Sequence, residues 1–549
     1  MPSRRGSLTA ALVVIAGLLA TACSASSAST DASGGSQGLG DKLATQPMAP
    51  PAVPDRLTRR LAWSAVAGII SALVLMIAAS VVRNSWEHPY IRLPSDGLPP
   101  WALSVHVALL PAVTVAMWAA ALLGGGGVAA GLAALSRGGR LPARLLLTVG
   151  FAAVALFTVL PPTGSTDAID YAAYGRMVVI GHSPYVMTPN QLRRLGDPVG
   201  EAIPRQWRKH VAVYGPLATA EQWAAAELGG TSAARIAFWL KLWAAIAFSV
   251  VALALDRMLR SDPARRARAH LLWSANPLLL WVLVAAGHLD VMGAAAGFLG
   301  MVVLYQRGPG EEIGALRGLV AGLLVGVAID VKASYVAFGI GIAWAARKSL
   351  AAWLSAAAGA ALVLLPTYAW FGAPAVRALR SRDADASVDN YYQMFVGSHG
   401  NVFPHQLLLA GLLFGAVALL LLWRLPDGIP ALPAIRPALA ISLAWLFIWP
   451  YELPWYDSMA LCLLALYPAS RLDWLVLLRL TAATFTLMPG NTGFPPQHLL
   501  AAVTSASLYW VAPALLLFAA VALVWLGLSQ RWKMNPPTVI PAEALPWPA

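Results

Sequence analysis

Two carboxylates and two phenols recur at helical spacing in the segment that starts at Asp167. Asp167, Asp170, Tyr171 and Tyr174 occupy positions i, i+3, i+4 and i+7. A helix would place all four on one stripe, and such a helix could lie along a membrane surface. Two neighbouring carboxylates can share a proton, so one of them could act as a general base towards a hydroxyl group. In the competing interpretation Asp167 caps the helix and Asp170 is solvated, and spacing alone does not separate the two.

Two later motifs combine tyrosine with turn residues. Residues 181–185 read Gly-His-Ser-Pro-Tyr, and residues 214–216 read Tyr-Gly-Pro. Both compositions are typical of turns that close a long loop. The rings of Tyr185 and Tyr214 could also stack on a sugar, so we take both residues as candidates for substrate binding.

His288 and Asp290 are separated by one residue and follow an apolar run. The two side chains could bind a metal ion or make a polar contact at a helix end. Because no third ligand lies nearby in the sequence, we expect no metal. The chain also has no P-loop, no dinucleotide fingerprint and no HExxH motif, so we expect no cofactor.

Cationic and aromatic residues complete the set of candidates. A leaving phosphate would be stabilised by Lys or Arg, and the candidates for this role are Lys332, Arg377, Arg380 and Arg382. For the three arginines the alternative is a solvated loop. Trp455 and Tyr456 are candidates for substrate binding, and Pro-Trp-Tyr at 454–456 is most simply an aromatic anchor at a membrane interface.

The composition indicates which kind of fold must position these residues. Of 549 residues, 58% are hydrophobic and 11% are charged, against roughly 25% charged in an ordinary soluble domain. The mean hydropathy is +0.66. These values exclude a soluble multidomain protein and a disordered chain, and two cysteines exclude a disulfide framework. We therefore expect an all-α polytopic membrane protein.

Fourteen apolar segments have about the length that crosses the hydrocarbon layer. They lie near 61–82, 101–123, 144–161, 231–253, 270–286, 290–306, 314–330, 333–346, 350–371, 405–423, 434–449, 455–470, 473–489 and 508–528. The segments are nearly free of charge. Alternate connections between them are short and basic, with Arg or Lys at 59–60, 137–144, 257–268, 307–317, 347–348, 424–436, 471 and 531–533. By the positive-inside rule these connections are cytoplasmic.

The same alternation places two long loops, 162–230 and 372–404, on the outer side. Ionisable groups at a membrane are candidates for function, and here the carboxylates and histidines gather on that one side. They include Asp167, Asp170, His288, Asp290, Asp330, Glu452 and Asp457, and Lys332 lies on the same side. We therefore expect one extracytoplasmic site beneath the two loops.

The N-terminus does not follow this pattern. Met1–Cys23 is similar to a secretory signal with a lipoprotein cleavage box, and a Ser/Ala/Gly-rich stretch follows it. Insertion of this segment would invert every later loop. We therefore expect residues 1–56 to be a poorly ordered extension, 57–534 to be the membrane domain, and 535–549 to be a cytoplasmic tail.

Taken together, these motifs resemble the actinobacterial polyprenol-phosphate-mannose-dependent α-1,6-mannosyltransferases, which are GT-C glycosyltransferases. The resemblance covers about residues 58–530. It rests on short motifs in a fixed order: Asp167, Tyr171 and Gly175; Gly181 with Pro184-Tyr185; Tyr214-Gly215-Pro216; Asn276-Pro277; His288 and Asp290; Lys332; and Pro454-Trp455-Tyr456. Ser183, Leu289 and Glu452 depart from the family pattern, which puts the sugar and the acceptor in doubt more than the class.

The resemblance implies a function. Asp167 would be the catalytic aspartate on the outer face, and Asp170 a less secure second. The enzyme would transfer mannose from polyprenyl-phosphate mannose to a lipid-linked mannan of the cell envelope, with inversion and α-1,6 linkage, in the cell membrane. Its partners would be the lipid donor, the glycan acceptor and membrane lipids, with no nucleic acid. The alternatives are transfer of arabinose or glucose, or a flippase for lipid-linked sugars, which would need ionisable groups at mid-depth.

Overall fold

The structure, a computed structural model, describes residues 55–82, 110–204, 207–306, 308, 311–378, 386–387, 390–396, 402–426, 428–487 and 498–532. Within these residues every regular element is a helix, which confirms the expected all-α fold. Residues 1–54 of the expected extension, the expected tail at 535–549, and Arg380 and Arg382 lie outside the described part of the chain.

Among the described residues, six helices are long and apolar enough to cross a membrane, judged by length and composition. They are α2 (Arg56–Ser80), α4 (Leu110–Ser136), α10 (Ala233–Met258), α16 (Leu350–Phe371), α19 (Pro404–Arg424) and the run of α23 (His498–Ala506), η5 (Ser507–Val511) and α24 (Ala512–Ser529). A bent pair adds a seventh if α12 (Pro277–Leu280) and η2 (Trp281–Ala285) are joined with α13 (Asp290–Val303), which lies at 111° to them. The fourteen expected segments are therefore not all long helices.

The other apolar segments form shorter helices. They are α5 (Ala143–Val159), α11 (Pro263–Leu272), α14 (Ala315–Val331), η3 (Ala333–Tyr335), α15 (Val336–Ala346), α20 (Ile435–Ile448), α21 (Ser458–Leu466) and α22 (Leu472–Leu487). The expected span 270–286 is broken because the Asn276 side chain accepts hydrogen bonds from the first turn of α12, where Pro277 begins the helix. Such breaks are tolerated at membrane depth where protein encloses them and their backbone groups find partners.

Helix α4 shows why one expected boundary was wrong. The segment at 101–123 was expected to end before the four glycines at 124–127, yet α4 continues through them to Ser136. A Cβ atom at Gly127 would lie 2.9 Å from the backbone of Ile69 and 3.1 Å from that of Gly68. The glycines therefore let α4 approach α2 closely, a packing typical of membrane helices, and this contact offsets the weak helix propensity of glycine.

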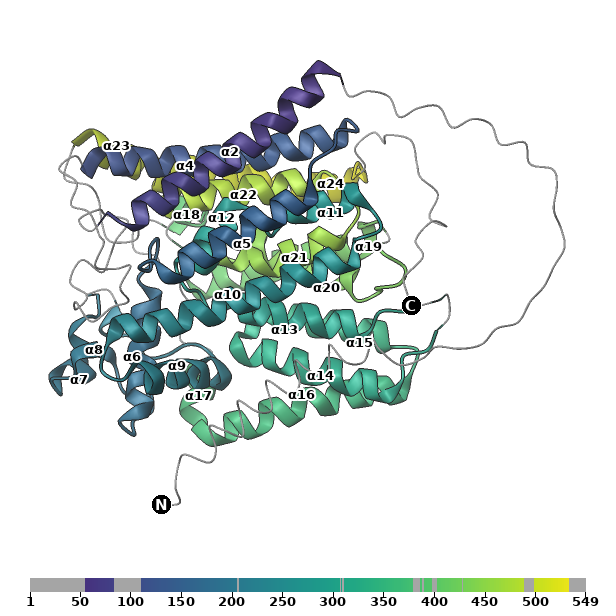
Figure 1. The fold of residues 1–549 in the computed structure, drawn as a ribbon. Coiled ribbons are helices and arrows are strands. Elements are labelled where there is room, and N and C mark those ends of the chain that lie inside the picture. Colours follow the sequence, from purple (N-terminus) through teal and green to yellow (C-terminus); the bar gives the residue numbers. More distant parts are fainter. Residues whose placement is uncertain are drawn as a thin grey trace, which may run out of the picture. The chain divides into compact units, whose positions relative to one another are not determined.

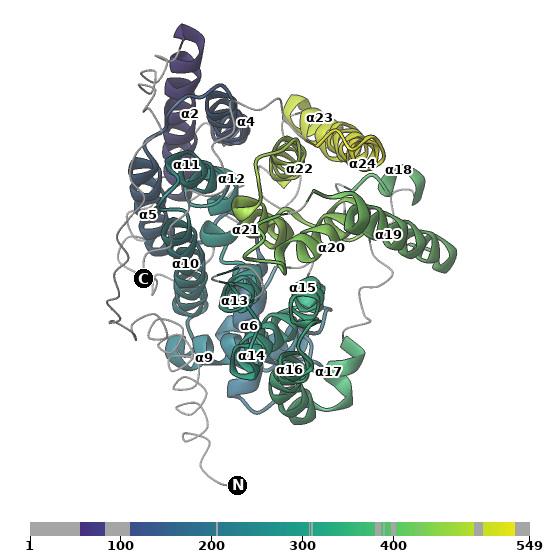
Figure 2. The same cartoon turned by 90° about the vertical axis from the view of Figure 1, so that its right-hand side faces the viewer.

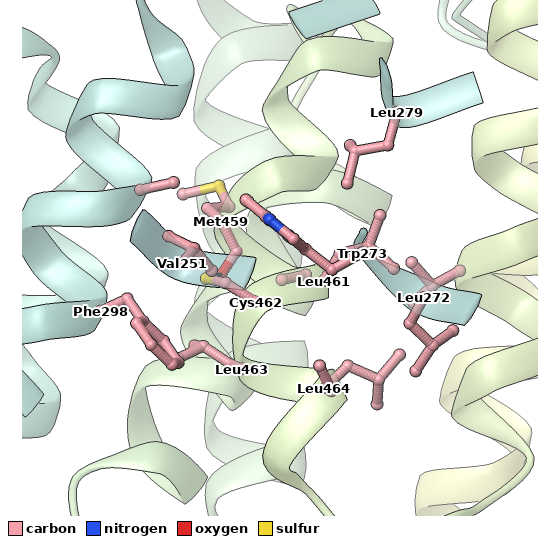
Figure 3. Close-up of a cluster of buried hydrophobic side chains, with 14 of the residues drawn as sticks. Val251, Leu272, Trp273, Leu279, Phe298, Met459, Leu461, Cys462, Leu463 and Leu464 are labelled. Atoms are coloured by element: carbon pink, nitrogen blue, oxygen red, sulfur yellow. Dashed lines mark hydrogen bonds between the residues drawn. The ribbon is translucent and has the colours of Figure 1, made fainter. Parts of the chain in front are cut away.

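Helix α21 is buried along its whole length and lies in the largest apolar core. Its side chains, among them Leu461 and Leu463, pack with Val251 of α10, Trp273 at the end of α11 and Phe298 of α13 (Figure 3). Figure 2 shows α21 between α13, α20 and α22. The short helix η4 (Pro454–Asp457) leads directly into α21, so this core fixes the position of the residues just before it.

Short helices gather at one end of the long ones (Figure 1). They are α6 (Asp167–Val179), α7 (Pro189–Arg194), α8 (Pro198–Glu201), α9 (Pro216–Gly229) and α17 (Ala373–Ala378), while α18 (Gln393–Val396) belongs to the second expected outer loop. A second apolar core lies among α6, α9 and their neighbours. The first expected outer loop is therefore a folded helical cap with its own core.

Candidate active site

Helix α6 begins at Asp167, as the residue spacing predicts. The cap position is held by Thr166, so Asp167 is not the capping residue. Only 6% of Asp167 and 4% of Asp170 is exposed, so the alternative of a solvated Asp170 is wrong. The physical reason is that α9 and α10 pack against α6.

Four of the candidate residues meet at the start of α6. The Oδ2 atom of Asp167 lies 3.7 Å from Nδ1 of His288. The hydroxyl group of Tyr171 lies 3.4 Å from the same Nδ1 atom and 3.1 Å from the hydroxyl group of Tyr214. Three segments that are far apart in the sequence therefore meet around one imidazole ring.

A tight turn brings His288 to this place. Helix η2 ends at Ala285. Gly287, two residues further on, has φ +74°, a left-handed conformation that glycine adopts without steric cost. The backbone N–H of His288 donates back to the carbonyl of Leu283, and Asp290 then begins α13. His288 and Asp290 consequently lie on opposite sides of the same turn, and both are fully buried.

Trp455 and Tyr456 of η4, named here the aromatic pair, lie on the other side of His288 and Asp290. The ring of Trp455 stacks on His288, with centroids 3.7 Å apart and planes inclined by 18°. The Nζ atom of Lys332 lies 3.2 Å from the ring centroid of Tyr456 and donates to Oδ1 of Asp290 at 2.7 Å. The aromatic pair is 3% and 8% exposed, so the interpretation as an interfacial anchor is wrong: both rings face the site.

These contacts define one group, which we name the His288 cluster. Its members are Asp167, Tyr171, Tyr214, His288, Asp290, Lys332, Trp455 and Tyr456. Two fully buried polar atoms of the cluster, Nε2 of His288 and Oδ2 of Asp290, have no hydrogen-bond partner among the described residues. Because buried polar atoms are rarely left unpaired, these two atoms are suited to bind the hydroxyl groups of a ligand.

The two tyrosines of the cluster are neutral phenols. Burial raises the pKa of Tyr171 and of Tyr214 well above the ordinary value, and the carboxylates of Asp167 and Asp290 act in the same direction. Their hydroxyl groups therefore donate and accept hydrogen bonds without becoming bases. This leaves the carboxylate of Asp167 and the imidazole of His288 as the proton acceptors at this end of the cluster.

Three candidate residues are not members of the cluster: Asp170, Tyr185 and Arg377. The hydroxyl group of Tyr185 donates to the carbonyl of Tyr214 at 2.9 Å and lies 2.8 Å from the hydroxyl of Thr219, so Tyr185 orients Tyr214 from behind. Arg377 is exposed on α17 and has none of the cluster's contacts. Lys332 belongs to the cluster, and 14% of its side chain is exposed.

Sequence reasoning missed two buried cations in segments it considered nearly free of charge. Lys241 of α10 is fully buried and donates to the carbonyl of Leu160 at 2.5 Å. Arg479 of α22 is fully buried and forms ion pairs with Glu452 and Asp457. The signal was present in the sequence, because an ionisable residue inside an apolar segment is itself a candidate for function.

The family assignment comes from sequence comparison. Residues 65–348, more than half of the chain, match the family described as alpha-(1->6)-mannopyranosyltransferase, N-terminal domain. The match includes six residues of the His288 cluster, from Asp167 to Lys332, whereas the aromatic pair lies beyond it. Comparisons with curated proteins and with solved structures found no match. The described part of the chain has several helices long and apolar enough to cross a membrane. The chain belongs to the alpha-(1->6)-mannopyranosyltransferase family and is therefore a glycosyltransferase.

Proposed function

We propose that the protein transfers mannose from polyprenyl-phosphate mannose to a lipid-linked mannan acceptor, and that the His288 cluster is the active site. The observation that carries this proposal is the pair of buried, unpaired atoms beside the Asp167 carboxylate, Nε2 of His288 and Oδ2 of Asp290. A sugar ring offers the hydroxyl groups that such atoms bind.

The cluster can support a single displacement. The acceptor oxygen attacks the anomeric carbon while the bond from that carbon to the phosphate oxygen breaks. The acceptor proton passes to the carboxylate of Asp167, which acts as general base, and the lipid phosphate leaves with the bonding electron pair. One displacement inverts the anomeric centre, so a β-linked donor gives an α-1,6-linked product.

Lys332 is the cation best placed for the leaving phosphate. Its ammonium group carries three N–H donors, and one of them is used by Asp290. A phosphate oxygen in the cluster would accept from another, and the developing negative charge would be stabilised in a poorly solvated place. Arg377, exposed on α17, would contact only the more distant part of the donor.

We further propose that the cluster faces the outer side of the cell membrane. At the opposite ends of the helices, arginines donate hydrogen bonds to carbonyl groups at helix C-termini. Arg265 donates to Leu466, Arg317 to Val303, and Arg436 to Leu425. Arginines in the short connections at these ends agree with the positive-inside rule. Nucleotide sugars are absent outside the cytoplasm, which favours a lipid-linked donor.

Thiol labelling tests the sidedness in a background without cysteine. Leu195 in the first outer loop is 62% exposed, and Ser261 is exposed at the basic end. With an impermeant reagent, Leu195→Cys should react in intact cells and Ser261→Cys only after lysis. The reverse pattern would contradict the proposed topology.

A donor assay tests the reaction itself. Purified protein in lipid nanodiscs is given a short α-1,6-mannoside acceptor and labelled mannose, either on polyprenyl phosphate or as GDP-mannose. We expect an α-1,6-linked product from the lipid donor alone. Efficient transfer from GDP-mannose without any lipid donor would overturn the proposal.

A further inference from the structure

Two of the carboxylates that were expected at the outer site form buried ion pairs within the protein. Glu452 and Asp457 stand on either side of the aromatic pair in the chain, and both form ion pairs with the guanidinium of Arg479 in α22. The three side chains are 2%, 0% and 1% exposed. A carboxylate bound by a buried guanidinium is not free to serve as a base, so these two acids have another role.

Arg479 also holds the chain before the aromatic pair. Its Nε donates to the carbonyl of Leu446 at 3.0 Å, in the last turn of α20. One side chain thus fixes the end of α20, the segment at Glu452 and the end of η4 at Asp457. Since the planar guanidinium presents its donors in a rigid fork, it sets the positions of these three points relative to one another.

Residues of the second expected outer loop form hydrogen bonds with Glu452. The hydroxyl group of Ser387 bonds both backbone groups of Glu452, at 2.6 Å each, and the side-chain amide of Asn390 donates to Oε1 of Glu452 at 3.3 Å. The backbone N–H of Ser387 donates to the carbonyl of Pro450 at 3.0 Å. Glu452 therefore links the described part of this loop to Arg479.

We propose that Arg479 is a positioning residue for mannosyl transfer, which holds the aromatic pair against His288 and Lys332. Arg479 acts through Asp457, the residue next to Tyr456. The inference rests on the proposed function of the cluster. Its consequence is that loss of Arg479 impairs sugar binding at a distance, because small misplacements in an active site can cost about a hundredfold in rate.

A second buried ion pair on the same helix provides a matched control. Arg268 of α11 bonds both carboxylate oxygens of Asp473, in the first turn of α22, at 2.7 and 2.5 Å. This pair is as buried as the Arg479 group but lies away from η4. If Arg479 only stabilised the fold, the two arginines would behave alike.

The experiment compares Arg479→Met, Arg479→Lys and Arg268→Met in nanodiscs, with KM for the lipid donor, kcat and the melting temperature as readouts. A triple variant, Arg479→Met with Glu452→Gln and Asp457→Asn, removes the three charges together, so that no carboxylate is left buried without its partner. Trp455→Ala tests whether the aromatic pair contributes to mannosyl transfer.

We expect Arg479→Met and the triple variant to raise the donor KM about tenfold or more, and Arg479→Lys to recover part of the loss. Arg268→Met should lower the melting temperature and leave the donor KM of the folded protein unchanged. A triple variant with a wild-type donor KM, or equal KM shifts for both arginines, would overturn the positioning role. If Trp455→Ala transfers mannose normally, the proposed site itself is wrong.

Discussion

Two buried histidines at opposite ends of the helices have opposite surroundings. His270 of α11 has both ring nitrogens engaged, with Ser274 at 2.9 Å and Asp256 at 2.8 Å. His288 has only long contacts at Nδ1, 3.4 Å to Tyr171 and 3.7 Å to Asp167, and none at Nε2 among the described residues. Both side chains are fully buried. Burial alone therefore does not mark a functional residue, whereas a buried nitrogen without a hydrogen-bond partner among the described residues does.

The same contrast holds for the cations of the two ends. Arg268, at the basic end, uses its donors on Asp473 and on the carbonyl groups of Leu464 and Tyr467. Lys332, in the cluster, has one acceptor at Asp290 and otherwise faces the ring of Tyr456. A cation whose donors are all hydrogen-bonded within the protein stabilises the fold. A cation that keeps further N–H donors can bind a ligand. The following predictions test this difference.

The largest effect is expected at Asp167. Asp167→Asn keeps the size of the side chain and removes the basic carboxylate, so transfer should fall by about a thousandfold or more, while the protein still inserts and accumulates. Glu201→Gln, an exposed carboxylate in the same loop, is the control and should transfer normally. Asp170→Asn should impair transfer less. Should Asp170→Asn abolish transfer while Asp167→Asn is tolerated, the catalytic aspartate has been assigned three residues too early.

The two histidines should separate activity from stability. His288→Phe keeps a ring to stack on Trp455 but removes both nitrogens, so kcat/KM should fall about a hundredfold with little change in melting temperature. His270→Phe loses two short hydrogen bonds and should cost about 1–3 kcal/mol of stability, with normal kcat/KM for the protein that remains folded. Equal changes in kcat/KM and in melting temperature for the two variants would show that His288 has no special role in transfer.

Lys332→Ala should raise the KM for the lipid donor about tenfold, which corresponds to about 1.4 kcal/mol, and raise the acceptor KM less. The reason is that the ammonium group would contact the donor phosphate. Because Asp290 also loses its donor, the melting temperature is measured in parallel. A change confined to the acceptor KM would assign Lys332 to the other substrate.

Much of this arrangement was readable from the sequence. The start of α6 at Asp167, the turn at Tyr214-Gly215 and the turn at His288 all follow local rules of spacing and turn chemistry. The contact of His288 with Trp455 and the pairing of Arg479 with Glu452 could not be predicted, because they join segments that only tertiary packing brings together.

The smallest effect concerns the helical cap that carries Asp167. Burial raises the pKa of Glu221 in α9 to about 8, and its enclosed Oε2 atom has no partner among the described residues. The folded state therefore keeps a proton that the unfolded state has released, and stability falls as pH rises between about 4.5 and 8. Glu221→Gln should flatten this part of the melting-temperature profile. An unchanged slope in the variant would show that Glu221 is ionised in the fold.

The central claim is that the unpaired atoms of the His288 cluster bind the mannosyl donor, and a trapped complex tests it most directly. The Asp167→Asn variant, which should bind without turnover, is imaged by cryo-electron microscopy with polyprenyl-phosphate mannose. The account predicts mannose hydroxyl groups about 2.7–3.2 Å from Nε2 of His288 and Oδ2 of Asp290, with the phosphate beside Lys332. A donor bound elsewhere, with both atoms still unpaired, would contradict it.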